Sequence, residues 1–272
     1  MSQQTSRLRK WAQRCKRRVT PLYYEIVYGV CAPKHVTCMN YGYGPVTEAN
    51  RPHFPEPSEG LQYELYWQTF SQLQQPLEEE QLLCEISCGR GGGLAFLRHF
   101  TASRLLGLER SSFARRHARR FGLDVRLAAA PTLPLEDESV DVFFSIEAAH
   151  NYHSDAFVSE LARCLKPGGR VLMADMNLGA DANVRNSISQ RYARHGMIVR
   201  RWRDIRPNVL ESLRLDEERK QLFLHTIPAL FRPEAAAYMG MVGSHKHLEM
   251  QQDERAYFIM LAEKLLRKSG ST

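Results

Sequence analysis

The stretch "EISCGRGGG", residues 85 to 93, places four glycines directly after the apolar run Leu82-Leu83-Cys84. A glycine-rich turn after a buried strand typically lets the backbone approach a nucleotide-like ligand closely. Three kinds of ligand suit such a turn: a dinucleotide, a nucleoside triphosphate, or a methyl-donating sulfonium cofactor. The turn alone does not choose among them, so the neighbouring residues must decide.

Two of the three ligands are disfavoured by the residues around the glycines. A triphosphate-binding loop needs Lys and then Ser or Thr after its last glycine, but Leu94 follows Gly93 here. Gly89 and Gly91 fit the start of a dinucleotide fingerprint. Leu94, however, stands where that fingerprint has Gly or Ala for close packing of the helix on the strand. The dinucleotide interpretation is weakened by this difference but stays open.

The centre of the chain alternates between strand patterns and helix patterns. Strands are expected over residues 82–88, 104–109, 124–129, 140–148 and 170–176, with helices over 92–100, 111–122 and 155–165. This alternation predicts a parallel, doubly wound α/β sheet with right-handed crossovers. A ligand is then expected beyond the carboxyl ends of the strands.

The C-terminal third of the chain has a less regular pattern. Residues 180–235 lack strand character and contain many arginines, so we expect a helical cap there. The last strands are expected within residues 236–268. Within that range, residues 257–266 suit either an edge strand or a helix, and a complete sheet requires the strand.

Three further motifs follow the glycine turn in a fixed order. Glu109 ends the second expected strand, "LPLEDESVD" (133–141) precedes the fourth, and "LKPGG" (165–169) precedes the fifth. With the glycine turn, this combination resembles the class I S-adenosylmethionine-dependent methyltransferases across about residues 80–176. A Rossmann-like, seven-stranded, mostly parallel sheet with an antiparallel last strand is therefore implied. The resemblance also implies N-terminal lid helices, an inserted helical cap, and no metal.

The resemblance can be narrowed to the branch that methylates lipid and polyketide hydroxyls. "SIEAAHNY" (145–152) and "YMGMVGS" (238–244) look like the phthiotriolone/phenolphthiotriolone dimycocerosate methyltransferases. They are more distantly similar to sterol C-methyltransferases and natural-product sugar O-methyltransferases. Outside residues 80–176 the match is thinner, and "MNYGYGP" (39–45) and residues 238–244 align only loosely. The implied reaction is methyl transfer from S-adenosylmethionine to a hydroxyl of a hydrophobic small molecule, leaving S-adenosylhomocysteine.

The resemblance places the cofactor on the glycine turn and the next strand ends. Glu109 is expected to accept the ribose hydroxyls, while Gly89 and Gly91 admit the methionine part. An aromatic ring such as Tyr41 or Tyr43 on the lid is expected either to attract the sulfonium or only to pack. The expected cofactor-binding residues are Glu85, Ser87, Gly89, Gly91, Glu109, Arg110, Ala130, Glu147 and Tyr41.

Two positions depart from the family pattern. Ser87 stands where the first glycine of the turn is usual, and Ala129 stands where an Asp commonly accepts the adenine amino group. Loss of that acceptor is expected to weaken adenine recognition by about 1 kcal/mol. Backbone groups near Ala130 and Leu133 are expected to compensate. These departures keep open a catalytically weak, methyltransferase-like binding or scaffold protein.

The expected catalytic residues are His150 and Asp175, after the fourth and fifth strands. A hydroxyl acceptor must lose its proton, and His is the natural base near pH 7. The alternatives are that His150 only shapes the pocket and that Asp175 only caps its strand. Glu147 would act instead on a carbocation in a C- or N-methyltransferase of a terpenoid, sterol or amine. A metal pair at His245 and His247 is not expected, since no carboxylates accompany them.

The net charge of +7 lies in the N-terminal segment. Residues 7–18, "RLRKWAQRCKRR", carry seven basic side chains and no acidic one, so 30 basic and 30 acidic residues remain. Apolar residues at helical spacing predict an amphipathic helix over residues 7–22. It would lie either on an anionic membrane or against its own domain. Nucleic acid is not expected as a partner, because no recognisable binding module accompanies the basic residues.

Length and cysteine usage define the domain organisation. We expect a basic segment over residues 1–20 and a single methyltransferase domain over 21–272, with its core at 80–176. The six cysteines form no C-x-x-C pair and suit reduced thiols. A signal peptide is disfavoured, because Glu25 interrupts the first apolar stretch. The sequence therefore predicts a cytoplasmic protein, with peripheral membrane contact as an alternative.

Overall fold

A computed structural model describes residues 33–229 and 232–266 of the chain. Within these residues the strands form a seven-stranded sheet in the order β3-β2-β1-β4-β5-β7-β6. Strands β1 to β5 pair in parallel, and β7 is antiparallel to both β5 and β6. This mixed sheet confirms the predicted Rossmann-like fold. The strands are β1 (Leu82–Ile86), β2 (Arg104–Glu109), β3 (Asp124–Leu127), β4 (Val140–Ile146), β5 (Leu165–Leu178), β6 (Met197–Asp204) and β7 (Arg255–Lys264).

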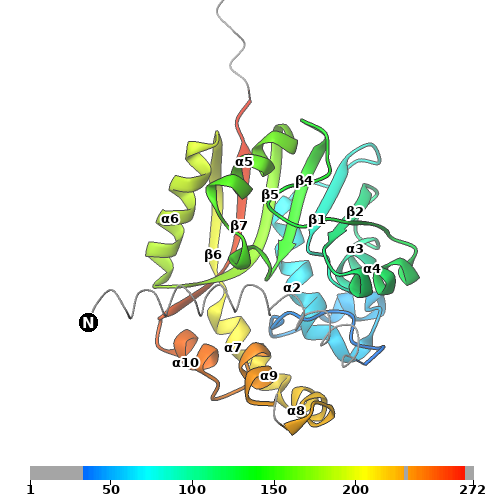
Figure 1. Cartoon of the computed structure of the whole chain (residues 1–272), viewed down its shortest axis with the longest axis vertical. Coiled ribbons are helices and arrows are strands. Elements are labelled where there is room, and N and C mark those ends of the chain that lie inside the picture. The colour runs from blue at the N-terminus through cyan, green and yellow to red at the C-terminus, as the bar shows by residue number, and fades with distance from the viewer. Residues whose placement is uncertain (1–32, 230–231, 267–272) are drawn as a thin grey trace, which may run out of the picture.

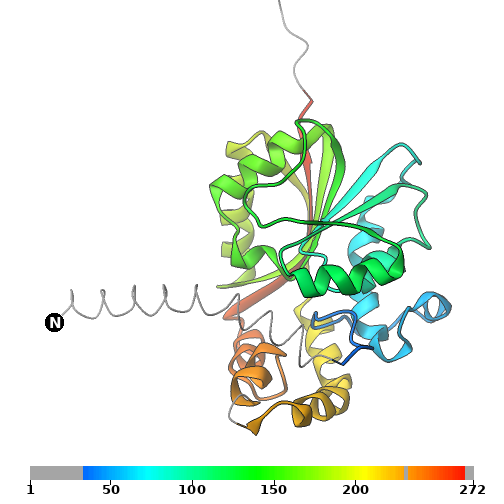
Figure 2. The ribbon, with the colours of Figure 1, turned by 45° about the vertical axis from the view of Figure 1, so that its right-hand side comes forward.

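Helices cover both faces of the sheet, which Figure 2 shows nearly edge on. Short 3₁₀ turns, η2 to η6, lie between them. The helices are α2 (Gly60–Phe70), α3 (Gly92–Leu97), α4 (Ser112–Ala118), α5 (Asp155–Cys164), α6 (Asp181–Arg194), α7 (Arg206–Leu215), α8 (Glu217–Thr226), α9 (Arg232–Tyr238) and α10 (His245–Gln251). The 3₁₀ turns are η2 (Glu48–His53), η3 (Pro57–Glu59), η4 (Ser71–Leu73), η5 (Arg119–Phe121) and η6 (Ala149–Asn151).

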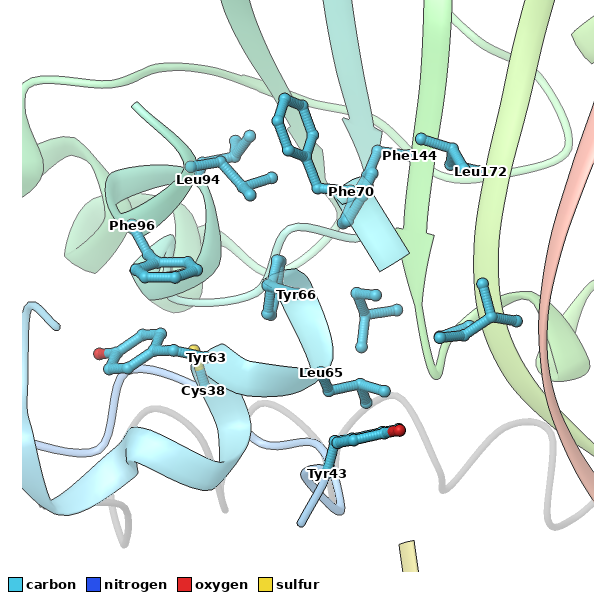
Figure 3. Packing of buried hydrophobic residues seen from close by; sticks show 14 of the residues in the cluster. Cys38, Tyr43, Tyr63, Leu65, Tyr66, Phe70, Leu94, Phe96, Phe144 and Leu172 are labelled. Carbon is cyan, nitrogen blue, oxygen red and sulfur yellow. The ribbon is translucent and has the colours of Figure 1, made fainter. Parts of the chain in front are cut away.

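One face of the sheet packs against α2 and α3 through aromatic side chains. Tyr63 of α2 stacks on Phe96 of α3 at 5.4 Å between ring centroids, and Figure 3 shows these two rings facing each other. Tyr66, one turn further along α2, stacks on Phe144 of β4 at 5.7 Å. These rings are buried. Aromatic pairs in such geometry stabilise the fold beyond their buried area, so α2 is fixed firmly over β1 and β4.

The opposite face is covered by α5 and α6 (Figure 1). Ser154 precedes helix α5, and its hydroxyl oxygen accepts the backbone N–H of Phe157 at 3.3 Å and so caps the first turn. Phe157 and Leu161 then face the sheet at helical spacing, fully buried. The amphipathic pattern and the serine cap explain why the sequence predicts this helix almost to the residue.

The expected cap differs from the prediction in its extent. Helices α7 to α10, Arg206–Gln251, lie beyond the carboxyl ends of the parallel strands, and we call them the cap (Figure 1). Residues 197–204, which we expected to be helical, form the edge strand β6. Arg200 is exposed, whereas Arg203 is partly buried and its guanidinium donates to Gln68 Oε1 at 3.0 Å, so an edge strand accommodates these charges. For that reason the charged sequence did not look like a strand.

The last strand also occupies a different place from the one expected. Residues 255–264 form a strand, as the sheet required, but β7 lies between β5 and β6 and not at the edge. Its central residues are buried, which explains the continuous apolar run. Residues 236–254, expected to contribute strands, instead complete the cap with the end of α9 and with α10.

The lid segment, residues 33–59, is irregular apart from η2 and η3. Glu59 fixes it at the start of α2, because its carboxylate accepts the backbone N–H of Thr37 at 3.0 Å and the Thr37 hydroxyl at 2.5 Å. Glu59 is fully buried. This lid segment runs between the sheet and the cap, so it is placed to cover a ligand at the strand ends.

Several predictions concern residues outside the described part of the chain. They are the basic segment 1–20, the amphipathic helix 7–22 with its membrane contact, and the thiols of Cys15 and Cys31. Within the described residues, Cys38, Cys84, Cys88 and Cys164 are free, buried thiols. No helix in the described ranges is both long enough and apolar enough to cross a bilayer.

Candidate active site

The glycine turn leaves β1 through three residues with left-handed backbone. The φ angles are 61° at Ser87, 55° at Gly89 and 84° at Gly91. Ser87 therefore adopts, at the first glycine position of the family pattern, a conformation that costs a residue with a Cβ about 1 kcal/mol or more. Its hydroxyl lies 3.2 Å from the Tyr152 hydroxyl. The serine thus keeps the turn in the shape that a glycine would give it.

Each glycine of the turn faces different surroundings. A Cβ on Gly89 would meet nothing within 4 Å, whereas one on Gly91 would lie 2.6 Å from the Ala118 side chain of α4. A Cβ on Gly92 would meet Thr37, and one on Gly93 would meet the Tyr66 ring. Among these four positions, therefore, Gly89 faces open space. Gly91, also predicted to admit the cofactor, allows α4 to pack closely.

Glu109 ends β2 directly beside Gly89. Its carboxylate accepts the backbone N–H of Gly89 at 2.9 Å and that of Ser111 at 2.7 Å. Burial raises the pKa of this carboxyl, although these backbone donors oppose the shift. A carboxylate offers about four acceptor positions, and backbone N–H groups occupy part of them, so Glu109 retains capacity for a ribose hydroxyl. The next residue, Arg110, is exposed at the rim of the sheet.

Glu85 of β1 is a buried carboxyl with one unused oxygen. Its Oε1 accepts the Tyr66 hydroxyl at 2.8 Å, while its Oε2 has no hydrogen-bond partner among the described residues. Burial, the largest cause, raises the pKa of Glu85 to about 8. An unsatisfied buried oxygen costs free energy unless a ligand supplies a donor. Glu85 is therefore suited to a positively charged donor such as an ammonium group.

The loop after β3 provides fewer hydrogen-bonding groups for an adenine than the family pattern does. Ala129 is exposed, and Ala130 is partly buried against the core. The backbone N–H of Leu133, which we expected to compensate for the missing Asp, donates to Glu160 at 2.9 Å. That donor is therefore already engaged.

His150 and Asp175 come together at the ends of β4 and β5. His150 Nδ1 lies 2.7 Å from Asp175 Oδ1, and the His150 backbone N–H donates to Oδ2 at 2.7 Å. Asp175 is 1% exposed, whereas a quarter of the His150 side chain is exposed. The Asn151 amide lies 3.2 Å from His150 Nε2. With Nδ1–H donating to Asp175, Nε2 is left as the unprotonated nitrogen, which is the state a general base requires.

Glu147 directly follows β4, at the same carboxyl edge of the sheet as His150. Hydrogen bonds from the lid segment and from β7 fix its side chain there. Its Oε1 accepts the Tyr41 backbone N–H at 2.5 Å and also the Tyr257 hydroxyl. Burial raises its pKa to about 7, partly opposed by these hydrogen bonds. Glu147 thus joins three elements that are distant in sequence. Residue-by-residue reading missed Tyr257, since only the register of β7 beside β5 brings it here.

Tyr41 connects the lid segment with the cap. Its hydroxyl donates to the Tyr238 carbonyl at 3.0 Å, and a Cβ on Gly240 would lie 2.7 Å from its ring. "MNYGYGP" and "YMGMVGS", which carried only a loose resemblance, are therefore neighbours in space. Tyr43 is also buried, and the Arg203 guanidinium lies 5.3 Å from its ring centroid.

No metal site is apparent in the described part of the chain. No group there of three or more His, Cys, Asp or Glu side chains is arranged to hold an ion. His245 and His247 belong to the first turn of α10, where the backbone N–H of His247 donates to the Ser244 hydroxyl at 3.4 Å.

The fold is that of a class I methyltransferase domain. The family described as "Methyltransferase domain" matches residues 84–173, which run from β1 to the middle of β5. The match and the sheet order confirm the predicted class, whose cofactor is S-adenosylmethionine.

Particular relatives extend this similarity. The chain is 28% identical over 200 residues to a phthiotriol/phenolphthiotriol dimycocerosates methyltransferase of Mycobacterium leprae, covering 71% of this chain and 72% of that one. It is 33% identical to a fatty-acid O-methyltransferase of Mycolicibacterium smegmatis, over 52% of this chain and 53% of that one. In eight curated relatives, the region matched by this chain covers between 36% and 72% of the relative's own length.

A solved structure shows the same fold over most of the chain. It is geranyl diphosphate C-methyltransferase from Streptomyces coelicolor, in complex with Mg²⁺, geranyl diphosphate and S-adenosylhomocysteine. The TM-score is 0.63 at 16% identity, covering 89% of this chain and 98% of that one. Identity this low supports the fold and not the substrate.

Proposed function

We propose that this protein transfers a methyl group from S-adenosylmethionine to a hydroxyl of a hydrophobic small molecule. The observation that carries the proposal is the His150–Asp175 pair at the carboxyl end of the sheet. A partly exposed imidazole, oriented by a buried carboxylate, is the arrangement that general-base catalysis requires. The lipid-related names of the relatives favour a hydrophobic acceptor.

The residues present fit the cofactor. Gly89 leaves open space at the turn, Glu109 has acceptor capacity for the ribose, and the free oxygen of Glu85 suits the ammonium group of the methionine part. When bound, the cofactor supplies an electrophilic methyl group on sulfur. The chain then has to align the acceptor with that methyl and exclude water. Residues 36–44 of the lid segment, which are largely buried, would serve this purpose.

His150 would receive the proton that the acceptor hydroxyl releases. Nε2 would accept the proton in place of its hydrogen bond with the Asn151 amide, while Asp175 keeps Nδ1–H as a donor and stabilises the imidazolium that forms. The second hydrogen bond, from the His150 backbone N–H to the same carboxylate, fixes the position of the loop. This chemistry would need no metal ion.

A second candidate is C- or N-methylation, favoured by Glu147. This carboxyl lies at the same rim between Tyr41 and Tyr257, whose ring centroids are 6.2 Å apart. A carboxylate and two aromatic rings would steady a cationic acceptor or intermediate. In that case Glu147, and not His150, would be essential for turnover. The third candidate is a protein that binds the cofactor without effective catalysis.

Labelled cofactor and a lipid extract distinguish these candidates. The full chain is incubated with methyl-labelled S-adenosylmethionine, and labelled products are identified by mass spectrometry. His150→Ala and Glu147→Gln are compared with His99→Ala, a change at an exposed histidine. O-methylated products lost in His150→Ala would support the first proposal. C- or N-methylated products lost in Glu147→Gln would favour the second, and no S-adenosylhomocysteine binding by calorimetry would contradict both.

A further inference from the structure

A cavity lies between the lid segment and the first part of the cap. Tyr41 connects it with the candidate active site, because its backbone N–H donates to Glu147 while its side chain lines the cavity. Arg219 and Lys220 of α8 contribute the basic part of the wall. Apart from Asn40, the remaining wall is largely apolar and consists of Val36, Cys38, Met39, Phe223, Tyr238 and Met239.

Lys220 is a buried ammonium group in this wall. Its side chain is 7% exposed, and its Nζ has no hydrogen-bond acceptor among the described residues. The carboxylate nearest to it in an ion pair, that of Asp216, has an oxygen 3.8 Å away. Asp216 already accepts from Arg219 at 2.6 and 2.7 Å and from Gln62 at 2.9 Å. The negative charge of Asp216 is therefore shared among several donors. It neutralises the positive charge of Lys220 only in part.

Two lysine ammonium groups lie near the ring of Tyr41, which lines the cavity. The Tyr41 ring centroid lies 5.6 Å from Lys220 Nζ and 5.9 Å from Lys246 Nζ. A ring face attracts a cation, but it does not replace the hydrogen bonds that an ammonium group loses on burial. Burial lowers the pKa of Lys220 to about 8. A bound anion would supply both the charge and the acceptors that are missing.

The geometry points to a recognition site for an acidic amphiphile, and we propose that the methyl acceptor carries a carboxylate or phosphate that binds Lys220. The apolar wall would hold the hydrocarbon part, while the ammonium group would hold the anionic oxygen. This proposal rests on the proposed function, since it specifies the acceptor of the same active site. It assigns Lys220 to substrate binding and not to the methyl-transfer step.

Direct binding without cofactor tests this inference separately from methyl transfer. Octanoate, octyl phosphate and octanol are titrated into the full chain by calorimetry, so that the headgroup is the only difference among the probes. The wild-type protein should bind at least one of the two anions about tenfold more tightly than octanol. Whether octanoate or octyl phosphate binds better identifies the headgroup. Equal affinity for octanol and both anions would overturn the proposal without any variant.

Two variants then locate the anion. Lys220→Met keeps the length of the side chain but removes the charge, and it should lower the affinity for the preferred anion about tenfold while leaving octanol within twofold. Lys34→Met, a change at an exposed lysine, is the matched control and should change neither. Lys220→Arg should retain most of the anion affinity. Undiminished anion binding by a folded Lys220→Met protein would contradict the assignment. These outcomes do not depend on whether S-adenosylmethionine binds.

Discussion

Asp175 accepts two hydrogen bonds from His150, one from the imidazole Nδ1–H at 2.7 Å and one from the backbone N–H at 2.7 Å. Both the ring and the loop that carries it are therefore oriented by one buried carboxylate. A residue needed only to cap a strand would not have to face the imidazole. If His150 is the base that we propose, Asp175 is the residue that would position it.

Asp175→Asn should reduce turnover much more than it reduces cofactor binding. An Asn amide that donates to Nδ1 would favour the tautomer with a proton on Nε2, which cannot accept one from the substrate. We expect kcat to fall about 100-fold or more, with S-adenosylhomocysteine affinity within twofold of wild type. Steady-state kinetics and calorimetry measure the two quantities. Asp124→Asn, at the start of β3, serves as the control, and unchanged kcat in Asp175→Asn would rule out the positioning role.

Glu85→Gln should weaken cofactor binding without unfolding the protein. At pH 7 the carboxyl, with its pKa raised to about 8, is largely protonated in the free protein, so an amide is a close replacement. The amide cannot, however, ionise to pair with the ammonium of the methionine part. We expect about tenfold weaker S-adenosylhomocysteine binding by calorimetry. The unfolding free energy at pH 7 should stay within about 1 kcal/mol. The exposed Glu78→Gln is the control, and equal affinity in Glu85→Gln would exclude this contact.

Ala129→Asp should strengthen adenine recognition. Residue 129 is exposed just after β3, and the neighbouring N–H of Leu133 is taken by Glu160. A carboxylate at this position would accept the adenine amino group and increase the affinity for S-adenosylhomocysteine about fivefold. S-inosylhomocysteine, which lacks that amino group, is the matched ligand and should gain nothing. A similar gain for both ligands would show that the effect is not adenine recognition.

Much of the site could be predicted because local sequence patterns indicate where each parallel strand ends. His150 and Asp175 follow neighbouring strands, and the carboxyl ends of parallel strands share one edge of the sheet. Their contact therefore follows from the strand assignment. The same holds for Glu109 beside Gly89, since β1 and β2 also pair in parallel.

The remaining contacts depend on long-range packing that no local pattern encodes. Tyr257 reaches Glu147 only because β7 inserts between β5 and β6, and an apolar run does not specify its partner strands. In the sequence, Lys220 is one of several charged residues in the first half of α8, and only the packing of the cap against the lid segment buries it. Likewise Gly93 looked like part of the ligand loop, whereas it makes room for Tyr66.

The pH dependence of stability should report on Glu147. Its pKa in the folded protein is raised to about 7 from an ordinary value of 4.5. The native state then binds more protons than the unfolded state between these values, so the unfolding free energy falls as the pH rises. The stabilisation is complete below about pH 4.5 and is lost as the pH passes through about 7.

Glu147→Gln removes this titration while its amide oxygen can still accept from Tyr41 and Tyr257. Between pH 5 and pH 8 the variant should therefore lose about 2 kcal/mol less unfolding free energy than wild type. Urea denaturation at both pH values measures the difference, and the exposed Glu136→Gln should behave as wild type. If Glu147→Gln lost as much stability as wild type over this range, Glu147 would be ionised in the native state at pH 5. Its use as a neutral hydrogen-bonding group at the rim would then be wrong, and the carboxylate would be available to steady a cation.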